Sequence, residues 1–110
     1  MTELASAVMA KAMTERALSQ AIVNLARLKG WLVHRDASWR STGTDPGAPD
    51  LFMARGGAVR CIEVKSERGK LTPDQEAWRD ALYSLKGNQV EYHVARPSDW
   101  LEGRVDEWLS

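Results

Sequence analysis

Three charged residues, Asp50, Glu63 and Lys65, have the types and the spacing that metal-assisted hydrolysis requires. Side chains of a strand alternate between its two faces, so Cys61, Glu63 and Lys65 share one face of the segment that contains them. Two charged residues on one face of a strand otherwise rich in Val, Ile and Cys are costly inside a core. We therefore predict that this face opens onto a site that holds a cation.

A hairpin is expected to bring Asp50 to Glu63. Residues 51–55 and 58–65 each have the pattern of a strand, and Gly56-Gly57 between them is a strong two-residue turn signal. Counting outward from a regular turn pairs Asp50 with residue 63. Two carboxylates that meet there form a hard oxygen site suited to Mg²⁺ or Mn²⁺.

A third carboxylate, Glu15, fits the same site. It lies three residues before Leu18 and seven before Ile22, which places it at the end of the core-facing stripe of the first predicted helix. An acid on such a stripe needs a partner or a metal ion. The alternative is a helix-terminal charge that interacts with the helix dipole.

The first helix that must position these residues is expected to run to about Lys29, with Gly30 as its stop. Its stripe comprises Leu18, Ile22, Leu25 and Leu28. The sequence leaves open whether residues 1–12 continue this helix or form a separate one. Leu4, Val8, Met9 and Met13 exceed what one helix face needs for its own core, and we expect them to meet a second copy of the chain, or else to belong to a frayed end.

A second helix has a clear start. Thr72 is expected as its N-cap, Pro73 as its first residue and Gln75 as the other member of a capping box. Its apolar stripe comprises Trp78, Ala81, Leu82 and Leu85, and Lys86-Gly87 ends it. The other predicted elements are a strand over Trp31–Arg35, loops over 36–49 and 66–70, a strand over Val90–Ala95, and a last helix capped by Ser98. The order α-β-β-β-α-β-α predicts an α/β fold with a mixed central sheet flanked by helices.

Composition sets limits on the class of protein. The 110 residues predict a single domain over 1–110, with 1–12 as a possible helical extension, and the single Cys61 excludes an internal disulfide. No apolar run approaches the ~20 residues of a membrane span, and no basic segment precedes an apolar block near the N-terminus. We expect a cytoplasmic protein without membrane contact. The balance of 15 basic and 15 acidic residues argues against bulk attraction to nucleic acid, but not against DNA as a substrate.

The same residues resemble the PD-(D/E)XK nuclease superfamily and, within it, the VRR-NUC family. A bare PD…EXK match is common by chance, and the GKLTPDQ element shortly after EVK makes this one specific. Ala48 stands where a bulkier apolar residue is common, which affects nothing catalytic. The matching elements extend from about Glu15 to Trp100: Glu15, Gln20, Gly47-Ala48-Pro49-Asp50-Leu51, Ile62-Glu63-Val64-Lys65, Gly69–Gln75 and Val94–Trp100.

The resemblance implies a role for each site residue. Asp50, Glu63 and the Val64 carbonyl would ligate Mg²⁺ or Mn²⁺, and Glu15 would complete the site directly or through water. Lys65 would orient or help to deprotonate the attacking water. Gln75 would lie near the site in addition to its capping role, and Gln20 would lie behind the site or on the helix surface. Cys61, His34 and His93 are expected to be non-catalytic.

The resemblance implies a metal-dependent DNA endonuclease of the stand-alone viral or prophage type, which acts in the bacterial host on four-way junctions or flaps as a homodimer, without a nucleotide cofactor. Five basic residues flank the site-bearing segments and together resemble a phosphate-contacting rim, although each alone is more often a surface charge: Arg35, Arg40, Arg55, Arg68 and Lys70. Two alternatives stay open. One is an inactive DNA-binding or phage packaging-associated module, against which the intact Asp50, Glu63 and Lys65 argue, and the other is a nuclease of simple duplex DNA.

Overall fold

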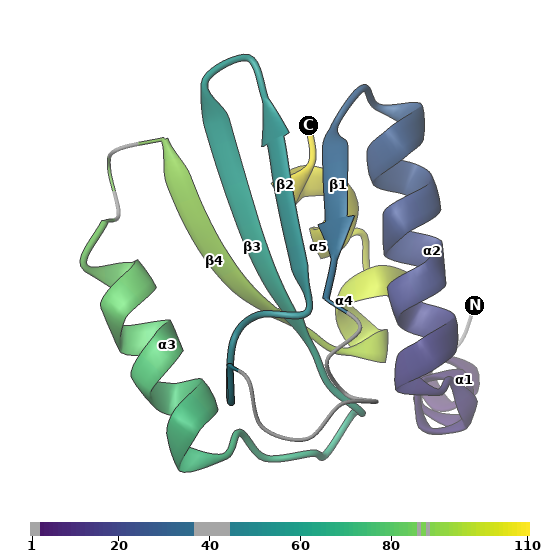
Figure 1. Cartoon of the computed structure of the whole chain (residues 1–110). Coiled ribbons are helices and arrows are strands. Elements are labelled where there is room, and N and C mark those ends of the chain that lie inside the picture. The colour runs from purple at the N-terminus through teal and green to yellow at the C-terminus, as the bar shows by residue number, and fades with distance from the viewer. Residues whose placement is uncertain (1–2, 37–44, 86, 88) are drawn as a thin grey trace.

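A four-stranded sheet organises the computed structural model, which describes residues 3–36, 45–85, 87 and 89–110 (Figure 1). The elements in chain order are α1 (Glu3–Ala12), α2 (Glu15–Leu28), β1 (Leu32–Arg35), β2 (Leu51–Arg55), β3 (Ala58–Val64), α3 (Pro73–Tyr83), β4 (Val90–Ala95), α4 (Pro97–Leu101) and α5 (Arg104–Trp108). The strands lie in the order β1-β2-β3-β4. The predicted α/β fold with a mixed sheet and flanking helices is confirmed.

The β2–β3 hairpin has the register that the sequence predicts. Leu51 pairs with Ile62 and Arg55 pairs with Ala58, so Gly56 and Gly57 form the two-residue turn. β1 is antiparallel to β2, whereas β4 is parallel to β3. Because parallel neighbours end at the same edge of a sheet, the residues that follow β3 and β4 lie side by side.

Residues 3–12 form a helix of their own, which answers the question that the sequence left open. Thr14 begins α2 as its N-cap, because its hydroxyl accepts a hydrogen bond from the Ala17 amide at 3.0 Å. α2 buries Leu18, Ile22, Val23 and Ala26. Leu28 is 85% exposed, so its predicted place on the core-facing stripe was wrong. The buried residues of α2 end at Ala26, and Leu28 lies beyond them.

The apolar core lies on one face of the sheet, between β1–β3, α2 and the C-terminal helices. Its buried members are Leu18, Ile22, Val23, Ala26, Trp31, Leu51, Met53, Ile62, Val64, Ala95, Val105 and Leu109. Trp31 connects the segment before β1 to the C-terminal residues, because its indole N–H donates to the Leu109 carbonyl at 2.9 Å. The Arg55 guanidinium lies 4.4 Å from the centre of the same ring, a cation–π contact.

α3 lies on the opposite face and stands apart from the other helices in Figure 1. The Tyr83 ring meets Tyr92 of β4 edge to face, with the ring centres 5.5 Å apart, and Tyr92 pairs with Cys61 of β3. The face of Cys61 is therefore the face that α3 covers. α3 has the predicted capping box but buries none of its residues and ends at Tyr83, so its predicted stripe does not form a packed core; Trp78 is 37% exposed.

The last predicted helix is two short helices. α4 begins at Pro97 and α5 begins at Arg104, with Gly103 between them at φ 84°. The expected Ser98 cap was wrong, since the N-cap is Arg96, two residues earlier, and Asp99 accepts a hydrogen bond from the Arg96 amide at 2.7 Å. Left-handed backbone at Gly103 is what interrupts the helix.

Gly47 yields a first prediction. Its φ is 84°, and an added Cβ would lie 2.4 Å from the Asp74 carbonyl carbon and 2.7 Å from the Gln75 amide nitrogen. Gly47→Ala should therefore lower the free energy of unfolding by more than the ~1–3 kcal/mol of left-handed strain alone. Gly57→Ala is the matched control, because Gly57 has a φ of 86° but open space around it. Thermal melts of both variants measure the difference, and equal losses would contradict close packing of residues 45–49 on the start of α3.

Candidate active site

Asp50 and Glu63 lie opposite each other at the open end of the hairpin. The pairing of Leu51 with Ile62, continued by one residue, places Asp50 beside Glu63. The Asp50 carboxylate accepts a hydrogen bond from the Val64 amide at 2.8 Å, and the Asp50 carbonyl accepts one from the Asp36 amide at 2.8 Å. Side chain and backbone of Asp50 are thus each held by a neighbouring segment, and the predicted convergence of the two acids is confirmed.

Glu63 is a buried acid with an unsatisfied oxygen. It is 2% exposed, and its Oε2 atom has no hydrogen-bond partner within the described part of the chain. Burial raises the pKa of Glu63 to about 9, and the hydrogen bond and the charge of Asp50 add to this rise, while the charge of Lys65 opposes it. An unpaired carboxylate is one of the costliest groups to bury, so its presence calls for a partner that the described residues do not supply.

A divalent cation fits this pair of acids. The orphaned Glu63 oxygen and the Asp50 carboxylate are hard oxygen ligands, as Mg²⁺ and Mn²⁺ prefer. The Val64 amide points to Asp50, and in a strand the carbonyl of the same residue points to the same edge, so the Val64 carbonyl is a third candidate ligand. A bound ion of this kind would lower the pKa of a bound water and supply countercharge for a phosphate.

Glu15 does not join this pair as the sequence predicted. It is exposed at the first turn of α2, and no group of three or more His, Cys, Asp or Glu residues suited to a metal ion forms among residues 3–36, 45–85, 87 and 89–110. The expected burial was wrong because Thr14 begins the helix directly before Glu15, whereas burial begins only at Leu18. An acid at this point interacts favourably with the helix dipole. A role for Glu15 through water stays a prediction.

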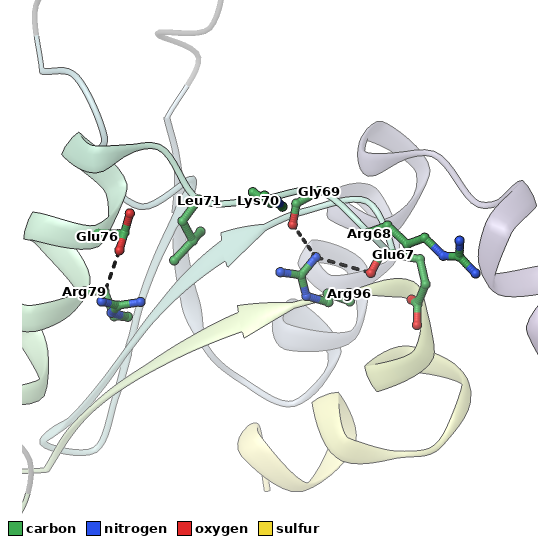
Figure 2. A pocket seen from close by; sticks show the side chains of 8 residues that line it. All are labelled: Glu67, Arg68, Gly69, Lys70, Leu71, Glu76, Arg79 and Arg96. Carbon is green, nitrogen blue, oxygen red and sulfur yellow. Dashed lines mark hydrogen bonds and ion pairs between the residues drawn. The ribbon is translucent and has the colours of Figure 1, made fainter.

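The segment after Lys65 forms one wall of a groove that reaches α3 (Figure 2). The groove has a volume of about 490 Å³ and is lined by Glu67, Arg68, Gly69, Lys70, Leu71, Glu76, Arg79 and Arg96. Arg68 and Lys70 are exposed there, as expected of residues that could contact phosphates. Gln75 completes the predicted capping box, with its Oε1 accepting from the Thr72 amide at 2.8 Å. Its role near the site stays a prediction.

The other three residues of the predicted phosphate-contacting rim differ in what the structure shows of them. Arg35 donates to the Gln20 side chain and to the Ser19 hydroxyl, each at 3.1 Å, so it joins β1 to α2 and still lies on the surface. Arg55 donates to the Lys29 carbonyl at 2.9 Å and packs on Trp31, which is a structural role and removes it from the rim. Arg40 lies outside the described residues.

The remaining reactive residues have structural environments. Burial raises the pKa of the Cys61 thiol to about 11, so the thiol is protonated at neutral pH and a poor nucleophile. His93 stacks on Trp108 with ring centres 4.2 Å apart, and burial lowers its pKa. His34 is exposed on β1.

One residue of this region was missed at the sequence level. Arg96 lies in the groove and bonds to the backbone of the segment that follows Lys65. The available signal was its place directly after a predicted strand. Once β3 and β4 are known to be parallel, that place lies beside Lys65.

The VRR-NUC domain, as a family model, matches residues 3–98 of the sequence. The chain belongs to the VRR-NUC family. It is thereby a member of the PD-(D/E)XK nuclease superfamily, and the family indicates a nuclease whose substrate is DNA. No curated protein and no solved structure matches the chain. None of the described helices is long and apolar enough to cross a membrane.

The raised pKa of Glu63 yields a second prediction. In the metal-free protein the folded state keeps this proton while the unfolded state loses it near the ordinary pKa of 4.5, so stability is highest below pH 4.5 and falls as the pH rises toward 9. Mn²⁺ must displace the same proton, so the affinity of the protein for Mn²⁺ should rise between pH 4.5 and 9. Calorimetric titration with Mn²⁺ between pH 5.5 and 8.5 measures this affinity.

Glu63→Gln is the control for this titration. The amide keeps the shape of the side chain and removes the buried charge, so the variant should lose Mn²⁺ binding, and its melting temperature at pH 8 should exceed that of the metal-free wild-type protein. The gain should shrink at pH 5, because this pH is close to the ordinary pKa of 4.5 and the folded state loses little stability there by keeping the proton. A destabilised variant at pH 8 would contradict the assignment of Glu63 as an acid held for a metal.

Proposed function

We propose that this VRR-NUC protein is a Mg²⁺- or Mn²⁺-dependent endodeoxyribonuclease that hydrolyses the phosphodiester bonds of branched DNA. The observation that supports it best is the buried, unpartnered Glu63 oxygen opposite Asp50. A carboxylate in that environment destabilises the metal-free fold, and ligation of a cation explains its retention. Family membership supports nuclease chemistry at this site.

Each residue has a distinct task in this proposal. Asp50, Glu63 and the Val64 carbonyl hold the cation. Lys65 follows directly in the chain, and its positive charge already acts on Glu63 in the metal-free protein. It orients the attacking water and offsets the negative charge that develops on the phosphate. Glu15 contributes through a water molecule.

The proposed substrate is branched DNA, a four-way junction or a flap, bound by two copies of the chain. α1 supports the assembly. It packs on α4 and buries Ala10, yet leaves Leu4 75%, Val8 59% and Met9 43% exposed. Apolar side chains at helical spacing are poorly explained on a surface that meets only water. A two-fold dimer through α1 would cover them and hold two sites at a fixed separation.

The third prediction separates the metal ligands from Lys65. Lys65→Ala should lose cleavage by about 10³-fold while Mn²⁺ binding persists, because the loss of one charge-stabilising group has effects of this size. Asp50→Ala should lose both, since it removes a ligand. Cleavage of duplex, flap and four-way-junction DNA with Mg²⁺, Mn²⁺ or EDTA measures activity, and calorimetry measures binding. Loss of Mn²⁺ binding in both variants would give Lys65 a structural role, and cleavage in EDTA would refute metal dependence.

The fourth prediction tests the dimer. Val8→Glu places a charge in the proposed α1 interface and should shift the mass measured by light scattering from dimer to monomer, with paired cuts on a junction lost. Leu28→Glu is the matched control, because Leu28 is an equally apolar and 85% exposed residue at the far end of α2. A wild-type monomer at tens of micromolar, or a dimer that persists in Val8→Glu, would exclude assembly through α1.

A further inference from the structure

Arg96 occupies the point where the ends of β3 and β4 meet. Val64 pairs with Ala95, and the Lys65 amide donates to the Ala95 carbonyl at 2.9 Å. Arg96 is the next residue after that pairing. It therefore lies directly beside the turn that follows Lys65, formed by residues 66–69.

A single nitrogen of Arg96 holds this turn together. Its Nη1 atom donates to the carbonyls of Ser66 at 2.8 Å, Gly69 at 2.7 Å and Glu67 at 3.3 Å. Figure 2 shows the guanidinium pointing up into the turn from the end of β4. A charged donor to backbone carbonyls makes stronger hydrogen bonds than a neutral one.

Both ends of this contact are anchored. The Arg96 amide donates to the Asp99 carboxylate at 2.7 Å, which fixes the backbone from which the guanidinium extends. On the other side, the Glu67 carboxylate accepts from the Ser98 amide at 2.9 Å. The 66–69 turn is thus held to the start of α4 by two side chains, Arg96 from the α4 side and Glu67 from the turn.

The turn lies next to the Lys65 side chain. A Cβ added to Gly69 would lie 3.6 Å from the Cδ atom of Lys65, in ordinary van der Waals contact, so the Gly69 backbone is about one bond length further from the Lys65 stem. A lysine has four rotatable bonds and loses rotamer freedom when it is fixed. A turn held in this place limits the positions that the Lys65 stem can adopt.

We infer that Arg96 is a positioning residue for Lys65: its guanidinium fixes the 66–69 turn, and the turn holds the Lys65 stem beside Asp50 and Glu63. The inference rests on the proposed nuclease function. It assigns Arg96 no contact with DNA. Because small misplacements of a reacting group reduce rates by up to about 10²-fold, the effect belongs in kcat.

The test is single-turnover cleavage at saturating Mn²⁺ by Arg96→Ala and Arg96→Lys. Arg96→Ala should lower kcat about 10–100-fold, with KM and Mn²⁺ affinity within about threefold of wild type. Arg96→Lys keeps a charged donor and should recover part of the loss. Arg55→Ala is the control, because Arg55 also donates to backbone carbonyls, those of Lys29 and Leu109, but has no part in the Arg96 contacts, and its kcat should stay at the wild-type value.

A double variant separates positioning from general destabilisation. If Arg96 acts through Lys65, Arg96→Ala should add nothing to the loss in Lys65→Ala. Multiplicative losses, or a rise confined to KM, would overturn the inference and point to a general structural role or to a phosphate contact. Should Arg96→Ala not fold, Arg96→Met keeps much of the length of the side chain and removes its hydrogen-bond donors, and an unchanged kcat in that variant would overturn the inference. Failure of the wild-type protein to cleave any DNA would instead refute the proposed function.

Discussion

A carboxylate buried inside a β-sheet is the constraint around which this molecule is arranged. Glu63 is 2% exposed on a strand whose neighbours Ile62 and Val64 belong to the apolar core. A group of this kind destabilises the metal-free protein by an amount on the order of several kcal/mol unless a proton or a cation compensates it. The surroundings of Glu63 provide a second carboxylate with which a cation could be bound. The regular hairpin brings Asp50 opposite, and the Val64 amide turns the Asp50 carboxylate to the same edge.

One face of the sheet forms the apolar core, and the other face carries the candidate active site. One face packs α2, α4 and α5 into a core of buried side chains. The other face carries Cys61, Glu63 and Tyr92 under α3, a helix without a buried residue in the described chain. α3 is held at its start by its capping box and by the close approach of Gly47 to Asp74, and at its end by the edge-to-face contact of Tyr83 with Tyr92. α3 therefore covers this face without adding a buried side chain of its own, and the core on the other face does not depend on it.

What the sequence predicts well depends on short-range geometry. The turn at Gly56-Gly57, the resulting convergence of Asp50 and Glu63, and the Thr72 capping box each involve residues whose spacing fixes their relation. The sequence mispredicted the burial of Leu28 and Glu15 and the split of the last helix at Gly103. These features depend on which part of a helix packs against the rest of the molecule. Periodicity shows that a face is apolar but not how far along the helix a neighbour covers it. Arg96 was missed because its contacts require a parallel pairing of β3 with β4, which no local pattern specifies.

The arginines show why charge counting misjudges this family member. Arg55 stacks on Trp31 and Arg60 donates to the Trp108 carbonyl at 2.9 Å on the core side of the sheet, and Arg96 holds the 66–69 turn. These three arginines are engaged in contacts within the protein, whereas Arg68 and Lys70 are exposed beside the groove. With a formal net charge of zero, long-range attraction can contribute little to DNA binding. In the proposed function, recognition therefore depends on contacts at the proposed metal site and on the spacing of two sites in the proposed dimer, both of which respond to the shape of a DNA substrate more than to its bulk charge.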